Sequence, residues 1–324
     1  MLKFSRLAGI LAAALLALMW IAPAQAQATR TWISGVGDDA NPCSRTAPCK
    51  TFPGAISKTA AGGEIDCLDP AGYGGVTVVK SITLDCGGGV GGQVGSILVS
   101  GTPGITVNGA GVVVQVRNMT INGVSGLGTK CINFVQGASL YVEHVAMFGF
   151  GSGTVPCIDF EPTVAGAKIF LRDVEIQANT GQGILIKPVG GVATTGLFDA
   201  MMMIGNGSSA LTVNDGATIS LRNSTISGNT KGIVVATSGI AATVNLYQSI
   251  VATNSVSGIA TTGTAALPNS STVTLFNSGI YNNGTGAGTG LSAGANTAII
   301  SFTNNAFGAN AGNAGAASST VPAL

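Results

Sequence analysis

Charged side chains recur at one position of a repeated segment, and their types suit acid–base chemistry or the binding of charged groups. In five successive repeats the position holds Arg117, Glu143, Arg172, Asp199 and Arg222. Carboxylates can act as general acids or bases, and guanidinium groups hold carboxylates through paired hydrogen bonds. His144, which follows Glu143, adds an imidazole, the side chain most often used as a general base. The candidate catalytic residues are therefore Arg117, Glu143, His144 and Arg172.

The alternation of positive and negative side chains along this column also has a structural interpretation. Glu143 and Asp199 lie two repeats apart, about 9.6 Å if repeats stack at the spacing of neighbouring strands. This is near the upper end of the roughly 6.5–9.5 Å between the carboxylates of inverting glycosidases. Arg172 lies between them, however, and a guanidinium keeps neighbouring carboxylates ionised, which is unsuitable for a general acid. Two interpretations stay open, a glycan-binding or catalytic patch and an exposed ladder of ion pairs.

Two aromatic residues continue the charged position into the next repeats. Tyr247 and Phe276 follow Arg222 in this column. Because aromatic rings can stack on sugars, they form a candidate glycan-binding face together with Asp199 and Arg222. The alternative is stacking between rings of neighbouring repeats.

The repeat that positions these residues reads apolar, four residues, apolar, two residues, asparagine. Intervals of 27, 23, 25, 29 and 27 residues separate the closing asparagines, which are Asn179, Asn206, Asn229, Asn254, Asn283 and Asn310. Such units are too short for propeller blades. They are typical of a parallel β-helix, in which each unit is one coil and apolar columns are buried by stacking. The asparagines would form a ladder, since an amide both donates and accepts hydrogen bonds.

This register predicts two inward-facing columns and about nine to ten coils. The first column holds Leu171, Phe198, Leu221, Leu246, Leu275 and Phe302, and the second holds Ile176, Met203, Ile226, Val251, Ile280 and Phe307. The fold class is therefore all-β, a single-stranded parallel β-helix.

Six cysteines suit disulfides in an oxidising compartment, and their spacing does not suit a zinc site. Cys131 and Cys157 are 26 residues apart, one coil, which brings their α-carbons within disulfide range. The expected pairs are Cys43–Cys49, Cys67–Cys86 and Cys131–Cys157. No metal or other cofactor is expected.

Composition and the N-terminus indicate an exported protein. Lys3 and Arg6, the apolar run 7–21 and the small residues up to Ala26 form the pattern of a secretory signal peptide. No later segment is long and apolar enough to span a membrane. Only 8% of residues are charged, the net charge is +1 and no basic stripe occurs, so nucleic acid is not expected as a partner. Residues 232–324 carry no charge at all.

The segment from Ser34 to Gly75 resembles the entry of secreted right-handed parallel β-helix proteins of the pectate-lyase superfamily. The matching pieces are Gly37-Asp38-Asp39, Lys50-Thr51-Phe52, a helix candidate at Pro53 to Ala60, Gly62-Gly63-Glu64-Ile65 and Gly72-Tyr73. The resemblance implies right-handedness, a short N-terminal capping helix and a glycan groove along one face. It supplies no catalytic motif that matches residue by residue; a lyase would add calcium.

Four segments and one preferred function follow. We expect a signal peptide at 1–26, an N-terminal loop and capping helix at 27–63, the parallel β-helix at 64–310 and a flexible C-terminal tail at 311–324. The preferred function is an exported protein that contacts extracellular polysaccharide or the cell surface without strong catalysis. The alternatives are a polysaccharide lyase or inverting glycoside hydrolase acting in a groove, and a structural, adhesin-like surface protein.

Overall fold

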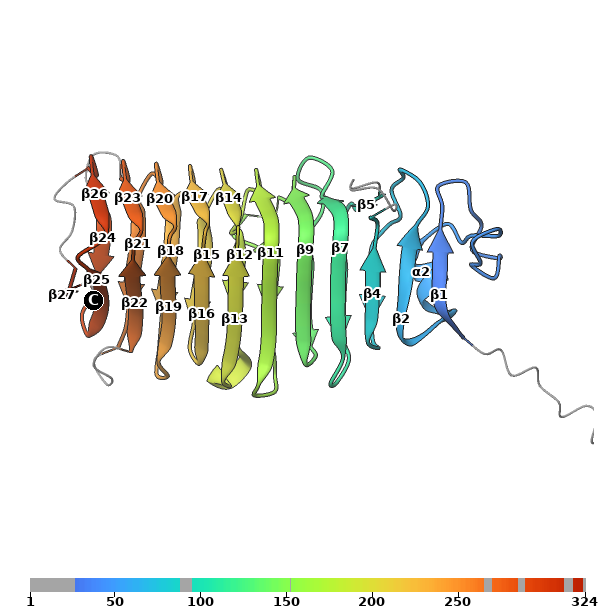
Figure 1. Ribbon diagram of the computed structural model, residues 1–324, viewed down its shortest axis with the longest axis horizontal. Coiled ribbons are helices and arrows are strands. Elements are labelled where there is room, and N and C mark those ends of the chain that lie inside the picture. Colours follow the sequence, from blue (N-terminus) through green and yellow to red (C-terminus); the bar gives the residue numbers. More distant parts are fainter. Residues whose placement is uncertain are drawn as a thin grey trace, which may run out of the picture.

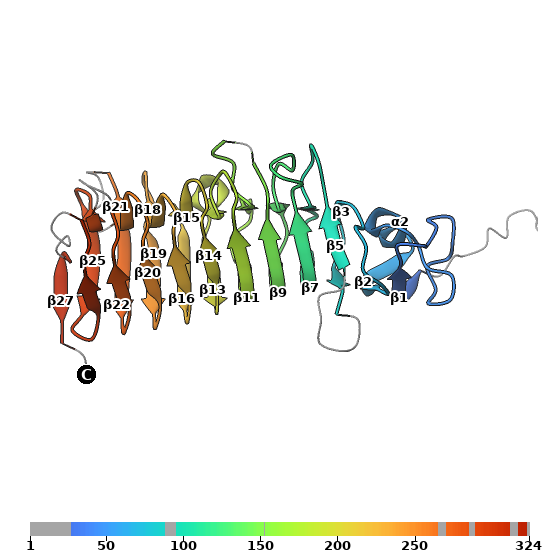
Figure 2. The same cartoon turned by 90° about the horizontal axis from the view of Figure 1, so that it is seen from above.

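The computed structural model describes residues 27–87, 95–151, 153–264, 270–284, 289–311 and 317–322. In this part the chain is an elongated stack of coils, with β1 at one end and β27 at the other (Figures 1 and 2). The signal peptide expected at 1–26 lies outside the described residues.

Two parallel sheets form the walls of the stack. The 18-stranded sheet contains β1 (Ala28–Ile33), β2 (Thr59–Cys67), β4 (Ile82–Asp85), β5 (Gly95–Leu98), β7 (Val113–Asn122), β9 (Ser139–Phe148), β11 (Ala167–Gln177), β13 (Thr194–Asp199), β14 (Met202–Ile204), β16 (Ala217–Arg222), β17 (Thr225–Ser227), β19 (Ala242–Tyr247), β20 (Ile250–Ala252), β22 (Ser271–Phe276), β23 (Gly279–Tyr281), β25 (Thr297–Phe302), β26 (Ala306–Gly308) and β27 (Ser319–Val321). The nine-stranded sheet contains β3 (Val76–Val78), β6 (Ile105–Asn108), β8 (Ile132–Gln136), β10 (Ile158–Phe160), β12 (Ile184–Ile186), β15 (Ser209–Asn214), β18 (Lys231–Ala236), β21 (Ser257–Thr262) and β24 (Thr289–Ala293). Its nine strands come from successive coils, and the stack has about eight turns, slightly fewer than the nine to ten expected.

The inward columns are those that the repeat predicts, except at the last coil. Leu171, Leu221 and Leu275 are at most 1% exposed. In β25, however, Ser301 and not Phe302 pairs with Leu275. Phe307 pairs with Ile280 as expected but is 39% exposed. The last coil holds one more residue between the two columns, which moves Phe302 out of the core.

The asparagine ladder is present from coil to coil. Asn206 donates through Nδ2 to Oδ1 of Asn229 over 2.9 Å, and Asn229 donates to Asn254 over 3.0 Å. Each Oδ1 also accepts a backbone N–H of the preceding coil, as Asn254 does from Asn229. The buried amides therefore bond to both neighbours, and this explains why the closing residue is conserved from repeat to repeat within the chain.

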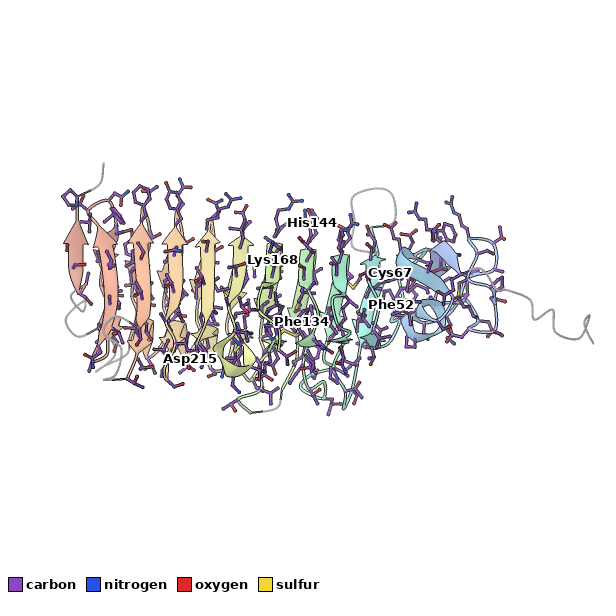
Figure 3. The ribbon with its side chains drawn as sticks, turned by 90° about the horizontal axis from the view of Figure 1, so that it is seen from below. Phe52, Cys67, Phe134, His144, Lys168 and Asp215 are labelled. Carbon is purple, nitrogen blue, oxygen red and sulfur yellow. A yellow bond between two sulfur atoms is a disulfide. The ribbon has the colours of Figure 1, made fainter. Side chains whose placement is uncertain are left out.

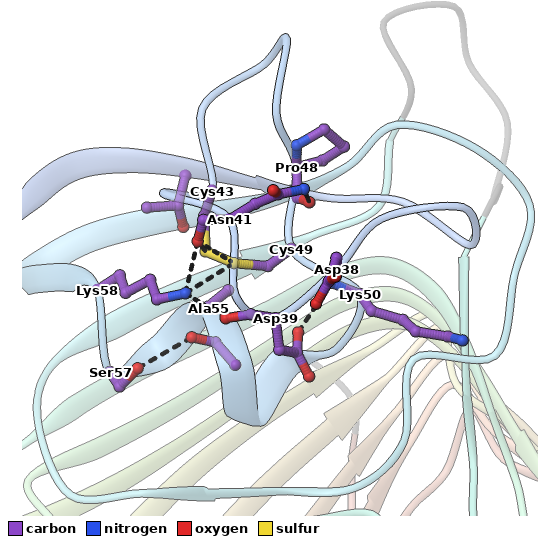
Figure 4. The surroundings of a disulfide bond; sticks show 12 residues. Asp38, Asp39, Asn41, Cys43, Pro48, Cys49, Lys50, Ala55, Ser57 and Lys58 are labelled. Atoms are coloured by element: carbon purple, nitrogen blue, oxygen red, sulfur yellow. Dashed lines mark hydrogen bonds between the residues drawn. A yellow bond between two sulfur atoms is a disulfide. The ribbon is translucent and has the colours of Figure 1, made fainter.

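The N-terminal end is closed by a helix that is shorter than expected. Helix α2 spans Phe52–Ile56 and not Pro53 to Ala60, because Thr59 and Ala60 already belong to β2. Thr51 caps it by accepting the Gly54 N–H, and Asp39 accepts hydrogen bonds from the backbone N–H groups of Lys50 and Thr51. Lys58 lies over the nearby disulfide and binds the carbonyl of Asn41 (Figure 4).

All three expected disulfides are formed. The pairs are Cys43–Cys49, Cys67–Cys86 and Cys131–Cys157, with Cα–Cα distances of 4.6, 4.5 and 4.6 Å. The last two join neighbouring coils. At the other end, the segment expected as a flexible tail at 311–324 contains β27, which pairs in parallel with β25. Backbone pairing with the last full coil therefore orders part of that segment.

Candidate functional site

The charged residues lie in one column on the outer surface of the long sheet. Parallel pairing places Glu143 between Arg117 and Arg172, and Asp199 between Arg172 and Arg222. Arg222 pairs with Tyr247, which pairs with Phe276. We call the residues from Arg117 to Arg222 at this position the charged column. Together with Tyr247 and Phe276, it places on one face the candidate catalytic and binding residues other than His144.

Contacts within the charged column join both of its carboxylates to a guanidinium. Arg172 Nη2 contacts Glu143 Oε1, and Arg222 Nη2 lies 2.8 Å from Asp199 Oδ2. Arg117 is directed upstream, with its nitrogens 3.9 Å from Glu64 and from Asp85. The ion pairs of Arg117 are therefore with the upstream carboxylates, whereas Glu143 contacts Arg172.

His144 lies beside the charged column at the bend of its coil, on a long edge of the stack (Figure 3). Its Nδ1 is 3.9 Å from Glu143 Oε1, and its Nε2 is 3.5 Å from Asp173 Oδ2. The side chain is 49% exposed. The structure therefore brings together Glu143, His144, Arg172 and Asp173, an open group in which an imidazole faces two carboxylates.

The electrostatics of Asp199 favour an ionised carboxylate. Burial acts to raise its pKa, but hydrogen bonds from Asn223 and Arg222 outweigh burial, so the pKa is lowered. The Asn223 and Arg222 nitrogens each lie 2.8 Å from an oxygen of Asp199. Asp199 is therefore suited to accept hydrogen bonds and unsuited to donate a proton.

An open hollow adjoins the middle of the charged column. It has a cavity volume of about 380 Å³ and is lined by Tyr141, Phe170 and Leu197 in addition to Glu143, Arg172, Asp199 and Arg222. The rings of Tyr141 and Phe170 stack on each other, with centroids 4.7 Å apart and planes at 10°. A ligand lying here would meet apolar ring edges on one side and alternating charges on the other.

The rings of Tyr247 and Phe276, the candidate sugar platform, stack on each other. Their centroids are 4.6 Å apart at 15°, and the edge of Phe302 meets Phe276 at 72°. Stacking along the axis of the coils turns ring faces toward each other and ring edges toward solvent. The geometry therefore favours cross-coil stacking over a sugar platform at this pair.

A second hollow, near the N-terminal end, was not predicted from the sequence. It has a cavity volume of about 510 Å³, and its lining includes Arg30, Trp32, Arg45, Asp66 and Asp85. Pairing shows that Trp32, Asp66 and Asp85 continue the column upstream of Arg117. This coil is only 19 residues long, so its register does not follow the spacing of the later repeats. The similar motifs Ile65-Asp66-Cys67 and Leu84-Asp85-Cys86 are the sequence feature that indicates it.

Glu64 lies beside this second hollow and is the carboxyl group there with a raised pKa. Burial, together with a hydrogen bond and repulsion from Asp66, raises the pKa of Glu64, while Arg30 partly offsets the effect. Arg30 contacts both carboxylates, at 3.1 Å from Glu64 and in closer contact with Asp66. The three groups form a compact ion-pair network.

A further column occupies the bend next to the charged column. Its members all have positive φ and are Asn118, His144, Asp173, Ala200, Asn223, Gln248 and Asn277. Asparagine and aspartate tolerate this backbone conformation, which explains the recurrence of amides. We call it the turn column. Two more hollows border it, one beside His144 and Asp173 and one beside Gln248 and Asn277.

Other candidate features lie away from this face. Lys130 and Asp159 form an ion pair on the nine-stranded sheet, and burial raises the pKa of Asp159. Within the described ranges, no group of three or more His, Cys, Asp or Glu side chains is arranged to hold a metal ion. In the same residues, no helix has the length and hydrophobicity to cross a membrane.

Comparisons with known proteins agree with this architecture. The family model described as right handed beta helix region matches residues 163–322. A solved pectate lyase, Pel9A, has a TM-score of 0.55 and 14% identity over 90% of this chain and 79% of that chain. A rhamnogalacturonan lyase has a TM-score of 0.42 and 13% identity over 85% and 74% of the two chains. The A-module of mannuronan C-5 epimerase AlgE4 from Azotobacter vinelandii has a TM-score of 0.32 and 15% identity over 91% and 89%.

Among curated proteins, no match to the sequence was found. Identities this low show similarity of fold alone. The parallel stack, the matched family model and the similarity to Pel9A together define a right-handed parallel β-helix.

Proposed function

We propose that this protein is an exported β-helix protein that binds polysaccharide along the charged column and does not cleave it. The observation that carries the proposal is the hollow between the Tyr141–Phe170 pair and the charged column. Arg172 and Arg222 are 64% and 50% exposed, so each can bind a ligand while keeping its carboxylate partner. The three disulfides suit an oxidising, extracytoplasmic compartment.

Acidic polysaccharide is the first ligand class to test. The pectate lyase with the similar fold acts, by its name, on an acidic polysaccharide. Guanidinium groups spaced two coils apart, as in Arg172 and Arg222, would meet carboxylates on successive parts of an extended chain. Such contacts weaken as salt screens them.

The absence of turnover is proposed from the charge arrangement. Glu143 is in contact with Arg172, and the pKa of Asp199 is lowered, so neither carboxylate is suited to donate a proton. A general acid would have to be supplied by another group on this face.

The alternative is a polysaccharide lyase or inverting hydrolase acting near Glu143 and Arg172. The observation that favours it is His144, which faces both Glu143 and Asp173. An imidazole held between carboxylates can serve as a base. Calcium belongs to this alternative only.

Affinity electrophoresis in gels containing polygalacturonate tests the binding proposal. Wild-type protein should be retarded, and Arg172→Ala with Arg222→Ala should restore mobility to that in a gel without polysaccharide. Lys187→Ala is the matched control, because Lys187 is an exposed base paired with Glu161 at 3.2 Å beyond the end of β12. Equal retardation of all three proteins, or none in the wild type for any acidic polysaccharide, would reject the charged column as the binding surface.

A further inference from the structure

The hollow at the C-terminal end of the turn column is lined by uncharged side chains. It has a cavity volume of about 440 Å³, and its lining includes Asn223, Gln248, Asn277, Asn304 and Tyr281. The four amides come from successive coils, whose backbones stack about 4.8 Å apart, and Tyr281 comes from the same coil as Asn277. We call these five residues the amide corner. At its upstream end Asn223 donates a hydrogen bond to Asp199, which pairs with Arg222.

The amides at the centre of the amide corner are available to a ligand. Asn223 donates to Asp199, and Asn304 Oδ1 accepts the backbone N–H of Asn277. Within the described part of the chain, the side-chain amides of Gln248 and Asn277 make no hydrogen bond, and both residues are exposed. The buried ladder at Asn229, Asn254 and Asn283, by contrast, uses its amides fully within the protein.

Tyr281 differs from the other aromatic residues of the surface. Tyr247 and Phe276 stack on each other, whereas Tyr281 takes part in no ring–ring contact among the described residues. A Cβ at Gly279 would lie 2.3 Å from Tyr281 Cε2 and 3.0 Å from its hydroxyl. The ring therefore lies over Gly279, along its own strand, and Gly308 of the next coil leaves space beside it. Two glycines thus make room for a ring that no other ring covers.

We propose that the amide corner binds the uncharged, hydroxyl-rich part of a polysaccharide, with Tyr281 stacking against a sugar ring. Gln248 and Asn277 would hydrogen bond to its hydroxyl groups, because each amide offers two donors and one acceptor. Residues 232–324 contain no cation, so a sugar carboxylate beside Gln248 and Asn277 would find a counter-charge only at the upstream end, where Arg222 is already paired with Asp199. This inference names the ligand class of the binding face and rests on the proposed polysaccharide-binding function.

Substitutions that are compatible with the local backbone conformation can test the amide corner. Asn277 has φ of 48°, and glycine adopts this conformation without strain, so Asn277→Gly removes the amide and keeps the turn. Asn282, with φ of 52°, lies outside the hollow, so Asn282→Gly is the matched control. Tyr281→Ala removes the ring, and Tyr281→Phe removes its hydroxyl alone.

The measurement is affinity electrophoresis of the full chain in gels containing galactomannan, mixed-linkage β-glucan or arabinoxylan. At least one neutral polysaccharide should retard the wild type. Tyr281→Ala should weaken that binding about tenfold or more, as expected for loss of a central aromatic contact. Asn277→Gly should weaken it about threefold, as for one hydrogen bond. Tyr281→Phe and Asn282→Gly should bind as the wild type does.

The outcomes separate this inference from the charged-column proposal. Retardation by polygalacturonate alone overturns the amide corner and leaves the charged column standing. Retardation by a neutral polysaccharide that Tyr281→Ala and Asn277→Gly leave unchanged also overturns it. Neutral binding that both variants weaken, without binding of polygalacturonate, supports the amide corner and rejects the charged column. Matching thermal unfolding of Asn277→Gly and Asn282→Gly excludes loss of folding as the cause.

Discussion

The coils up to Arg222 and the coils after Lys231 keep the same register through different interactions. The first group is joined by two inter-coil disulfides and by ion pairs such as Arg222–Asp199. The second group has no charged side chain and is joined by amides, hydroxyls and the stacked rings of Tyr247 and Phe276. Since the uncharged coils stack without ion pairs, the register of this fold does not require them. The charged column therefore calls for a further explanation, and the proposed polysaccharide binding would supply one.

The asparagine ladder should be the largest single contributor common to both regions. Asn254→Ala would remove the acceptor of the Asn229 backbone N–H and one acceptor of the Asn229 side chain, and it would remove the Nδ2 donor to Asn283. We expect a loss of about 4 kcal/mol in the free energy of unfolding, as for the loss of several buried hydrogen bonds. Urea unfolding measures it. Gln248→Gly, which removes an exposed amide, should cost no more than about 0.5 kcal/mol, and an equal cost for both would refute the ladder.

Removal of a disulfide should affect the charged region alone. Replacing Cys131 and Cys157 with alanine should cost about 3.5 kcal/mol, from the closure entropy of a loop of this length. Hydrogen exchange should then rise in β8 and β10 and stay unchanged in β21 and β22. Uniform loss of protection along the stack would show that the two regions unfold as one unit.

Acid should also weaken the N-terminal end first. Burial acts to raise the pKa of Asp69, but hydrogen bonds from Gly35, Ser34 and Tyr73 lower it below the ordinary value of 3.8. The resulting stabilisation is fully present above 3.8 and is lost as the pH falls through the lower folded value. Asp69→Asn should cost about 1.5 kcal/mol at neutral pH.

The same variant should reduce the loss of stability in acid, which unfolding experiments at pH 7 and at pH 2.5 would reveal. An unchanged difference between these two conditions would show that Asp69 does not govern the acid response. The uncharged coils should keep their exchange protection at both pH values.

The ion pairs of the charged column should contribute least. Arg222 is 50% exposed, so Arg222→Ala should cost about 0.5 kcal/mol, and salt should reduce even that. The free energy of unfolding in low and high salt measures the effect. A cost above about 2 kcal/mol would mean that the column is mainly a structural element and would weaken the binding proposal.

The sequence predicts the coil well because its strongest signal, the closing asparagine, is also a buried, fully bonded group. It predicts the charged column for the same reason, since the column has a fixed offset from the repeat. The prediction is wrong for Phe302 because an additional residue separates Ser301 from Phe307. It is wrong for the end of the capping helix because β2 begins already at Thr59.

The candidate site was harder to predict because its parts depend on the bend of the coil. The turn column is interrupted by Ala200, so its shared positive φ becomes evident only in the structure. The direction of Arg117, toward Asp85 and Glu64, depends on a coil of a different length. The position of the Tyr281 ring depends on Gly279 and Gly308, which come from two coils.

The central claim is that this face binds polysaccharide without cleaving it. Incubation of the wild type with polygalacturonate, with and without calcium, can follow the bound fraction together with new reducing ends and unsaturated products. We predict retention on the polysaccharide, lost in the Arg172→Ala and Arg222→Ala double variant, with no product in either condition. Product formation that Glu143→Gln abolishes while the fold stays intact would contradict this account and establish an enzyme.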